Sequence, residues 1–155
     1  MQDVHQFLQG LGLSAEFRSR LAPLTHPDGT HASADQPLTV AYHDACHMLH
    51  GQGIAAEPRA LLAAIPHLRL REAVEAGVCC GSAGIYNLVQ PEEAAALGRI
   101  KAADLAGTGA ELVASANIGC TLQIRRHLDE GDFPQAVLHP LQLLERSWRT
   151  GQGRV

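Results

Sequence analysis

Four cysteines are the residues of this 155-residue chain with the clearest chemical potential. They come as one, two adjacent and one: Cys46, then Cys79 and Cys80, then Cys120. Adjacent cysteines rarely pair with each other, because the disulfide would be strained. Convergent thiolates could hold a zinc ion or an iron–sulfur cluster. A thiol–disulfide switch at the adjacent pair is a third interpretation, and small buried hydrophobic side chains are a fourth.

The spacing of the cysteines favours a cluster over zinc. Zinc sites usually contain two close C-x-x-C pairs, whereas adjacent cysteines reach two irons of a larger cluster more easily than one small ion. The small residues Gly81-Ser-Ala-Gly84 follow the pair directly. They would let the backbone approach an inorganic core, and their N–H groups could donate to its sulfurs. A tight strand-to-helix turn explains the same residues equally well.

Histidines surround the first cysteine, and they are the other candidate ligands. They are His43, His47 and His50. If this segment were helical, the three rings would share a face and could hold zinc. We favour instead a role in orienting the loop through hydrogen bonds to backbone, with His47 supporting the adjacent ligand Cys46. Asp44 is expected to bond to loop backbone, and His139 to cap a helix.

The elements that must position these residues follow from hydrophobic periodicity. Strands are expected over residues 38–42, 68–71, 111–115 and 136–139. Helices are expected over residues 58–64, 91–106, 120–130 and 141–148. Strands that alternate with helices predict an α/β fold, with a parallel, Rossmann-like sheet of about four strands covered by helices on both faces.

This topology predicts where the cysteines lie. Open parallel sheets bind ligands beyond the carboxyl ends of their strands. Cys46 follows the first expected strand, Cys79 and Cys80 follow the second, and Cys120 follows the third. All four are therefore expected at the carboxyl edge of the sheet, which argues against scattered core cysteines.

The first 37 residues carry no motif. Short helices are expected over residues 4–11 and 14–21, the second capped by Ser14, with a Pro- and Gly-containing surface loop over 22–37. We therefore expect residues 1–37 to be a helical lead-in and loop, and residues 38–150 to form the cysteine-rich domain.

Composition excludes several functions. The formal net charge is −4 and Lys and Arg form no run, so nucleic acid is not an expected partner. No apolar stretch approaches the roughly 20 residues of a membrane span, and the first residues lack signal-peptide features. A cytoplasmic location is expected, where four cysteines indicate metal or redox chemistry rather than disulfides. The sequence shows neither a serine–histidine–acid order nor a paired-carboxylate arrangement that would suggest hydrolysis.

Three segments together resemble the cysteine-rich (CCG) domain of heterodisulfide reductases and of the iron–sulfur subunits of glycolate and lactate oxidases. They are His43-Asp-Ala-Cys46-His47, Cys79-Cys80-Gly81-Ser-Ala-Gly-Ile-Tyr-Asn87 and Asn117-Ile-Gly-Cys120. The resemblance covers roughly residues 38–145, and the middle segment is particularly like the glycolate oxidase iron–sulfur subunit.

One departure from the wider family concerns the last segment. That family ends its motif with C-x-x-C, whereas this chain has Asn117 first, a form that glycolate-oxidase-type members share. An amide is a poor iron ligand, but it can hydrogen-bond to a sulfide or a cysteine sulfur. The resemblance therefore favours a four-thiolate [4Fe–4S] cluster over an opened, five-cysteine type.

The resemblance implies an electron-transfer domain of a glycolate or lactate (2-hydroxy-acid) oxidase complex. A flavin-containing subunit would oxidise the acid, and electrons would pass through iron–sulfur centres toward a quinone or another acceptor. The implied cofactor is a [4Fe–4S] cluster on the four cysteines, supported by Gly81, Asn117 and His47. The domain would not be catalytically complete alone.

The resemblance also implies further partners. One is the N-terminal ferredoxin-like region that family subunits carry and this sequence lacks, so a fragment or a stand-alone module is expected. Membrane association would be at most peripheral, at the inner face. The alternative function is a structural zinc (Zn2+) module that docks partner subunits.

Overall fold

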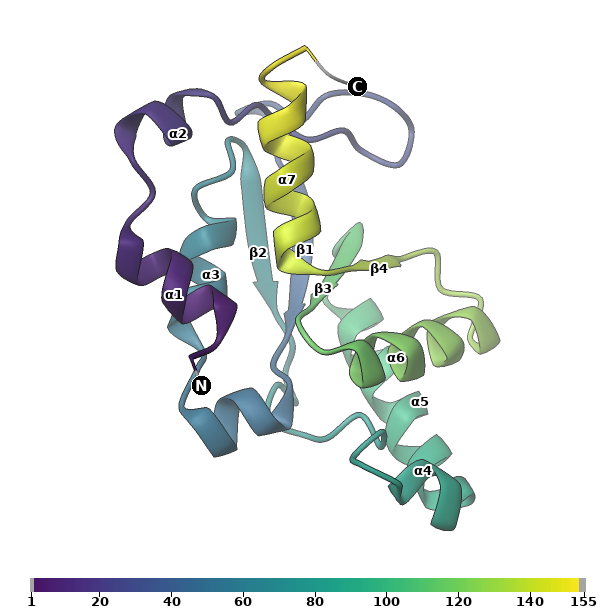
Figure 1. Ribbon diagram of the computed structural model, residues 1–155. Coiled ribbons are helices and arrows are strands. Elements are labelled where there is room, and N and C mark those ends of the chain that lie inside the picture. Colours follow the sequence, from purple (N-terminus) through teal and green to yellow (C-terminus); the bar gives the residue numbers. More distant parts are fainter. Residues whose placement is uncertain (1, 154–155) are drawn as a thin grey trace.

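A four-stranded, all-parallel sheet forms the centre of the computed structural model, which describes residues 2–153 (Figure 1). The strand order is β2-β1-β3-β4. The strands are β1 (Leu38–His43), β2 (Leu68–Glu72), β3 (Leu112–Ser115) and β4 (Ala136–Leu138). This arrangement confirms the predicted parallel α/β fold with four strands.

Seven α-helices and one π-helix are described around the sheet. The N-terminal ones are α1 (Val4–Leu11) and α2 (Ala15–Ser19). The π-helix (His47–Gln52) and α3 (Ala56–Leu62) follow β1. Then come α4 (Tyr86–Val89), α5 (Pro91–Gly107), α6 (Ile118–Glu130) and α7 (Pro140–Thr150). The sequence predicted neither the π-helix nor α4.

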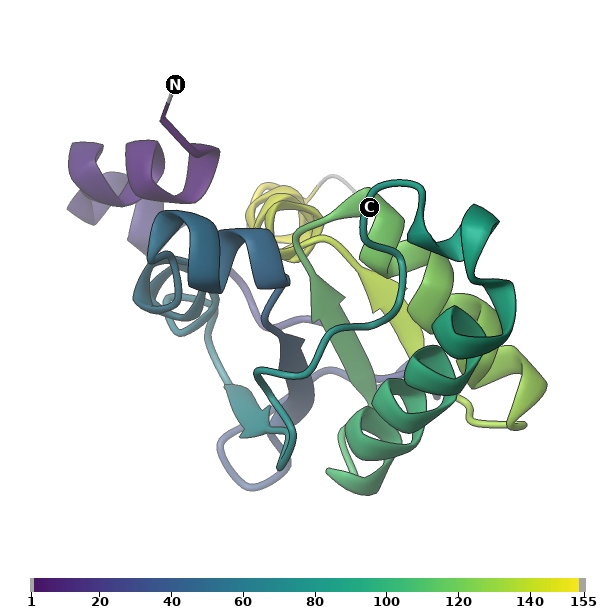
Figure 2. The same ribbon diagram turned by 90° about the horizontal axis from the view of Figure 1, so that it is seen from below.

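Helices cover both faces of the sheet, as predicted (Figure 2). Strands alternate their side chains between faces, so neighbouring residues of β1 enter different cores. Ala41 packs with α5 and α6, whereas Val40 and Tyr42 pack with α3 and α7. Among the residues described, the core under α5 and α6 contains no Phe, Tyr or Trp, whereas the core under α3 and α7 includes Tyr42, with Phe17 and Trp148 packed against it.

Helices α5 and α6 approach each other closely at Gly98, which has no side chain. A Cβ atom there would collide with the ring of His127 on α6. Gln123 of α6 donates to the Ala94 carbonyl of α5 at 3.0 Å. This contact fixes the two helices that flank the carboxyl end of β3.

The first 37 residues pack onto the sheet domain more intimately than their sequence predicted. Leu21, Leu24 and Ala32 are buried in the core beneath α3 and α7. The Ser147 hydroxyl on α7 donates to the Ala22 carbonyl at 2.7 Å. The interpretation of residues 22–37 as a surface loop was therefore incomplete, because its few apolar side chains are core residues.

Among residues 2–153, no helix combines the length and the apolar character needed to cross a bilayer.

Candidate metal centre

The strand order places a topological switch point at the carboxyl ends of β1 and β3. The chain moves from β1 outward to β2, and then crosses back to β3 on the other side of β1. The helices that follow β1 and β3 therefore lie on opposite faces of the sheet, and open parallel sheets bind ligands at such a point. Cys46 lies three residues beyond β1, and Cys120 lies five residues beyond β3. The fold therefore places the outer two motif segments at its ligand-binding position.

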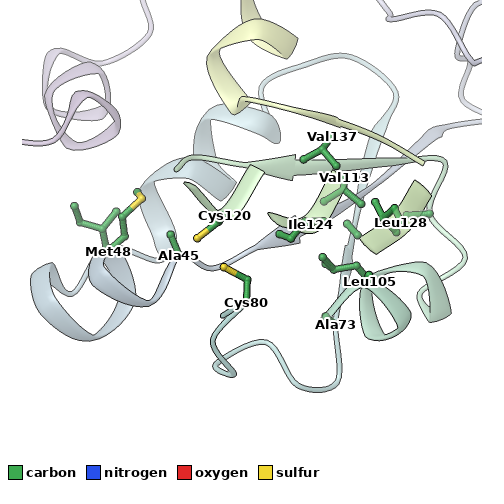
Figure 3. Close-up of a cluster of buried hydrophobic side chains, with 14 residues drawn as sticks. Ala45, Met48, Ala73, Cys80, Leu105, Val113, Cys120, Ile124, Leu128 and Val137 are labelled. Carbon is green, nitrogen blue, oxygen red and sulfur yellow. The ribbon is translucent and has the colours of Figure 1, made fainter. Parts of the chain in front are cut away.

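The adjacent pair lies in the segment between β2 and α4, after the carboxyl end of β2. Figure 3 shows the sulfurs of Cys80 and Cys120 turned toward one another, near Ala45. Both side chains are almost fully buried, with exposures of 1% and 4%. All four cysteines are free thiols.

His43 completes a compact group of donors. One ring nitrogen of His43 and the sulfurs of Cys80 and Cys120 all lie within 4.8 Å of one another. His43 is the last residue of β1 and is 1% exposed. Neither of its ring nitrogens has a hydrogen-bond partner among the described residues. Such unpartnered, buried nitrogens are costly, because burial strips them of water.

The two buried thiols shift each other's pKa in opposite directions. A hydrogen bond from Cys120 lowers the pKa of Cys80 to about 3, against the effect of burial, and the proximity of His43 and Ser82 lowers it further. The Cys80 thiolate in turn raises the pKa of Cys120, and burial adds to that rise. Cys80 is therefore the thiolate of the pair. A metal that binds both sulfurs must release the Cys120 proton.

The outer cysteines form the half-buried side of the site. Cys46 precedes the π-helix, and Cys79 precedes the buried Cys80. Burial raises the pKa of Cys79, and the neighbouring Cys80 and Cys46 sulfurs add to that rise. Cys46 also raises the pKa of Cys120. These mutual effects connect Cys46 with both the adjacent pair and Cys120.

The turn after the adjacent cysteines is held by Gly81. Its φ of +86° favours glycine, and a Cβ atom would collide with the Ala94 carbonyl of α5. Its N–H donates to the Cys79 sulfur at 3.3 Å. This is the kind of backbone donor to sulfur that the Gly81 turn was expected to supply.

Ser82 joins the site, although sequence reasoning did not single it out. Its hydroxyl lies 3.2 Å from the Cys80 sulfur, and it donates to the Cys120 sulfur at 3.9 Å. Its single proton can be given to one sulfur at a time, and the nearer Cys80 sulfur is the thiolate of the pair. Its place two residues after Cys80, within the Gly81–Gly84 turn, was the only signal that could have found it.

Asn117 has a clear structural role as the N-cap of α6. Its side-chain oxygen accepts a hydrogen bond from the Cys120 N–H at 3.0 Å. The amide thus fixes the backbone that carries Cys120 and satisfies a donor at the start of the helix. We expected this side chain to bond to sulfur, but its oxygen bonds to backbone.

The other histidines of the Cys46 segment lie apart from His43. The π-helix exposes both His47 and His50. His50 bonds to the Gly77 carbonyl at 3.4 Å, which is the loop-orienting role expected for it. Exposed His47 does not enter the compact group that His43 forms with the buried sulfurs.

Asp44 forms an ion pair rather than the backbone hydrogen bonds expected for it. Its two oxygens accept from Arg59 of α3 at 2.8 and 2.7 Å. Arg59 also binds Glu72 at the end of β2 with two hydrogen bonds. The prediction was wrong because the partner lies 15 residues away, on the helix that crosses back over the sheet.

A buried lysine fastens the loop that leads to the adjacent cysteines. Lys101 of α5 is fully buried, and its ammonium donates to the Glu75 carbonyl. Asp104, 3.5 Å from that ammonium, accepts hydrogen bonds from the backbone N–H groups of Val74 and Glu75. The pair holds the loop after β2 against α5, upstream of Cys79.

These features define a class of site: a partly buried, cysteine-rich candidate metal centre at the switch point of a parallel α/β sheet. The donors fit an iron–sulfur cluster or a soft metal ion, since four thiols meet at one edge and buried imidazole nitrogens lack partners among the residues described.

The family follows from comparison with known sequences. The family described as "Cysteine-rich domain" (CCG) matches residues 40–125, which is more than half of the chain and spans all four cysteines. The chain therefore belongs to the CCG cysteine-rich domain family, as its motifs predicted. The match leaves residues 1–39 outside the family's own region.

Relatives carry names from three kinds of protein. A fumarate reductase (CoM/CoB) subunit of Methanothermobacter marburgensis is 38% identical over 72% of this chain and 23% of its own. The probable glycolate oxidase iron-sulfur subunit of Bacillus subtilis is 40% identical over 59% of this chain and 20% of its own. Lactate utilization protein A of an Exiguobacterium species is 28% identical over 74% of this chain and 47% of its own. The chain thus spans about a fifth to a half of these relatives.

No solved structure matches the chain.

Proposed function

We propose that this chain is an iron–sulfur electron-transfer domain of a 2-hydroxy-acid (glycolate or lactate) oxidase complex. The observation that supports the proposal best is that the free, buried thiols of Cys80 and Cys120 lie within 4.8 Å of each other, while Cys46 and Cys79 are also free and follow the carboxyl ends of β1 and β2. Similarity to a probable glycolate oxidase iron-sulfur subunit and to Lactate utilization protein A supports it.

The four cysteines would hold the cofactor. A [4Fe–4S] cluster supplies one-electron chemistry that ordinary side chains lack. The chain's own contribution is to deliver thiolates, exclude water from the inner pair and donate hydrogen bonds to sulfur. The Gly81 N–H and the Ser82 hydroxyl supply such donors, and donors of this kind tune reduction potentials.

A four-thiolate cluster is the type we propose. Asn117 cannot supply a fifth thiolate, and its oxygen is already engaged with the Cys120 N–H. The domain would pass electrons from a flavin-containing subunit toward a quinone or another acceptor, and would not oxidise the acid by itself.

Partner subunits would approach beside the cysteines. Exposed aliphatic side chains flank the motif segments: Ile85 and Leu88 after the adjacent pair, and Ile118 and Leu122 around Cys120. Exposed apolar side chains that gather in a patch mark interaction sites. We propose that flavin-containing subunits and a ferredoxin-like region of the same subunit dock there.

We also propose that residues 38–150 form the cysteine-rich domain behind a lead-in over residues 1–37. We propose a cytoplasmic location, with at most peripheral contact at the inner membrane face. The family match over residues 40–125 supports the first of these proposals.

Metal and sulfide analysis of untagged protein, purified without oxygen, tests the proposal. We expect brown protein with broad visible absorbance, equal amounts of iron and acid-labile sulfide, and Mössbauer spectra of a cubane cluster. Colourless protein that carries one zinc per chain and takes up no iron under reconstitution would contradict it.

A structural zinc module is the second candidate, and one observation favours it. The His43, Cys80 and Cys120 donor atoms lie within 4.8 Å of one another, close enough for a single ion. In that case zinc removal should unfold the carboxyl edge of the sheet, and no redox activity should be found.

A further inference from the structure

His43 is the buried polar side chain whose environment is least complete. It is 1% exposed, and both Nδ1 and Nε2 lack hydrogen-bond partners in the described part of the chain. A neutral imidazole has one donor and one acceptor, and each destabilises the folded protein when it is buried without a partner. Because buried polar groups are nearly always satisfied, a group from outside the chain is expected at this ring.

The position of His43 is fixed by the sheet. It ends β1, where its backbone is paired in register with Ser115 of β3. Strand alternation places its side chain on the same face as Ala41, toward α5 and α6. A residue held by a central strand presents its ring with little freedom, which suits a ligand more than a mobile surface histidine does.

The distances around His43 are those of neighbouring ligands. Donors that share a tetrahedral metal lie roughly 3–4 Å apart, because metal–sulfur and metal–nitrogen bonds are about 2.0–2.3 Å long. One His43 nitrogen lies within 4.8 Å of the sulfurs of Cys80 and Cys120. A small inward movement would bring all three onto one metal atom.

The competing oxygen donors are already used. Both Asp44 oxygens accept from Arg59, and the Asn117 oxygen accepts from the Cys120 N–H. His50 bonds to the Gly77 carbonyl. Among the described residues, His43 and Ser115 end β1 and β3 with buried polar atoms that have no partner, and of the two side chains the imidazole is the common ligand of soft metals.

We propose that His43 is a nitrogen ligand of the metal centre, so that its donor set is sulfur plus imidazole rather than sulfur alone. This proposal rests on the proposed function, because it assigns a ligand to the same centre. A histidine that binds a metal through one ring nitrogen commonly donates a hydrogen bond from its other ring nitrogen. The Ser115 hydroxyl, which is buried and also unpartnered among residues 2–153, is the group in register to receive that bond.

Nitrogen hyperfine spectroscopy on the full chain tests the proposal. The protein is reconstituted anaerobically with iron and sulfide, with natural-abundance or ¹⁵N-labelled histidine, and pulsed EPR spectra are recorded in a paramagnetic oxidation state. We expect a strongly coupled nitrogen in wild type whose signal changes with ¹⁵N labelling. The signal should persist in His31→Ala, which removes an exposed histidine, and disappear in His43→Ala.

His43→Cys covers the case in which His43→Ala fails to fold, because it offers another soft donor. It should retain iron and sulfide without the nitrogen signal. A complete cluster without a coupled histidine nitrogen in wild type, or an unchanged signal in His43→Cys, would overturn the assignment and leave the proposed function intact.

Zinc binding distinguishes a failure of the iron–sulfur function from a failure of the His43 assignment. If the protein binds zinc but no iron or sulfide, the iron–sulfur function is wrong, and zinc X-ray absorption then counts the donors. A nitrogen contribution lost in His43→Cys would support the His43 assignment, and an all-sulfur shell would overturn it. If neither metal binds, both proposals are wrong.

Discussion

The two ends of the sheet carry polar clusters of opposite character. At the amino end, Glu111 precedes β3 and binds Thr39 of β1 through one oxygen, which accepts from both the N–H and the hydroxyl at 3.0 Å. Its other oxygen lies 2.5 Å from Nδ1 of His26, whose Nε2 lies 3.2 Å from the Gln36 carbonyl. Every polar atom named here has a partner within the chain.

At the carboxyl end the cluster is incomplete. His43 and Ser115 are buried there with side-chain atoms that have no partner among the residues the structure covers, and the neighbouring thiols lower the pKa of Cys80 and raise that of Cys120. The amino-end cluster therefore serves the fold, since it pins the N-terminal segment to the sheet. The carboxyl-end cluster has the properties of a site that an external group completes.

The largest expected effect is on the metal content of the carboxyl end. Cys80→Ser should abolish cofactor binding, because it removes the thiolate at the centre of the buried group. Far-UV circular dichroism should be unchanged, since the hydrophobic cores hold the sheet. His50→Ala is the control, because its ring contacts only the Gly77 carbonyl. Equal metal loss in both variants would shift the site toward the exposed histidines.

The next effect concerns the loop that carries the adjacent cysteines. Lys101→Met should lower the free energy of unfolding by about 3 kcal/mol, because it leaves Asp104 buried without its cation. Metal affinity should fall by about tenfold as the loop loosens. Urea unfolding measures the free energy of unfolding, and competition with a chelator measures the metal affinity. Arg99→Met, an exposed position on the same helix, should change neither. Unchanged metal affinity in Lys101→Met would show that the site does not depend on the contact between Lys101 and the loop before Cys79.

The amino end should respond to pH. The hydrogen bond to Glu111 raises the pKa of His26 above its ordinary 6.5. Stability from this shift is fully present below pH 6.5 and is lost as pH rises through the raised pKa. Burial raises the pKa of Glu111, but the hydrogen bonds from Thr39 and His26 have the larger combined effect and lower this pKa below 4.5. That stabilisation is lost as pH falls through the lowered pKa.

His26→Gln tests this dependence. The difference in unfolding free energy between wild type and variant should be largest between pH 4.5 and 6.5, and should shrink on either side. Urea unfolding across pH measures it, with His31→Gln as the matched control. A difference that grows above pH 6.5 would contradict the assigned pairing. Metal content should be unaffected, because the pair lies at the opposite end of the sheet.

The smallest effect concerns the N-cap of α6. Asn117→Ala should cost about 1 kcal/mol of stability, because the Cys120 N–H loses its acceptor. The cluster should remain, with a shifted reduction potential. Asn117→Asp should restore stability, since an aspartate caps as well. Loss of the cluster in Asn117→Ala, with the cluster kept in Asn117→Asp, would mean that the cap is essential to the site.

Sequence alone determined the fold class and the edge of the sheet at which the cysteines lie. Both follow from local signals: apolar runs of strand length, proline in the first turn of α5, and the place of each cysteine after a strand. It also predicted Ser14 as a helix cap and the capping role of His139, whose Nδ1 accepts from the Leu141 N–H at 3.1 Å.

Only the tertiary structure decided which histidine joins the cysteines. The sequence offered all three of His43, His47 and His50 as possible zinc ligands and favoured His47 as the support of Cys46, because the two are adjacent. In the structure the end of β1 and the start of the π-helix separate these histidines, and it is His43 that lies close to the buried sulfurs of Cys80 and Cys120. The Asp44–Arg59 pair and the Lys101 contact likewise join residues that are distant in the chain. Such partners depend on strand order and helix crossing, which local periodicity does not encode.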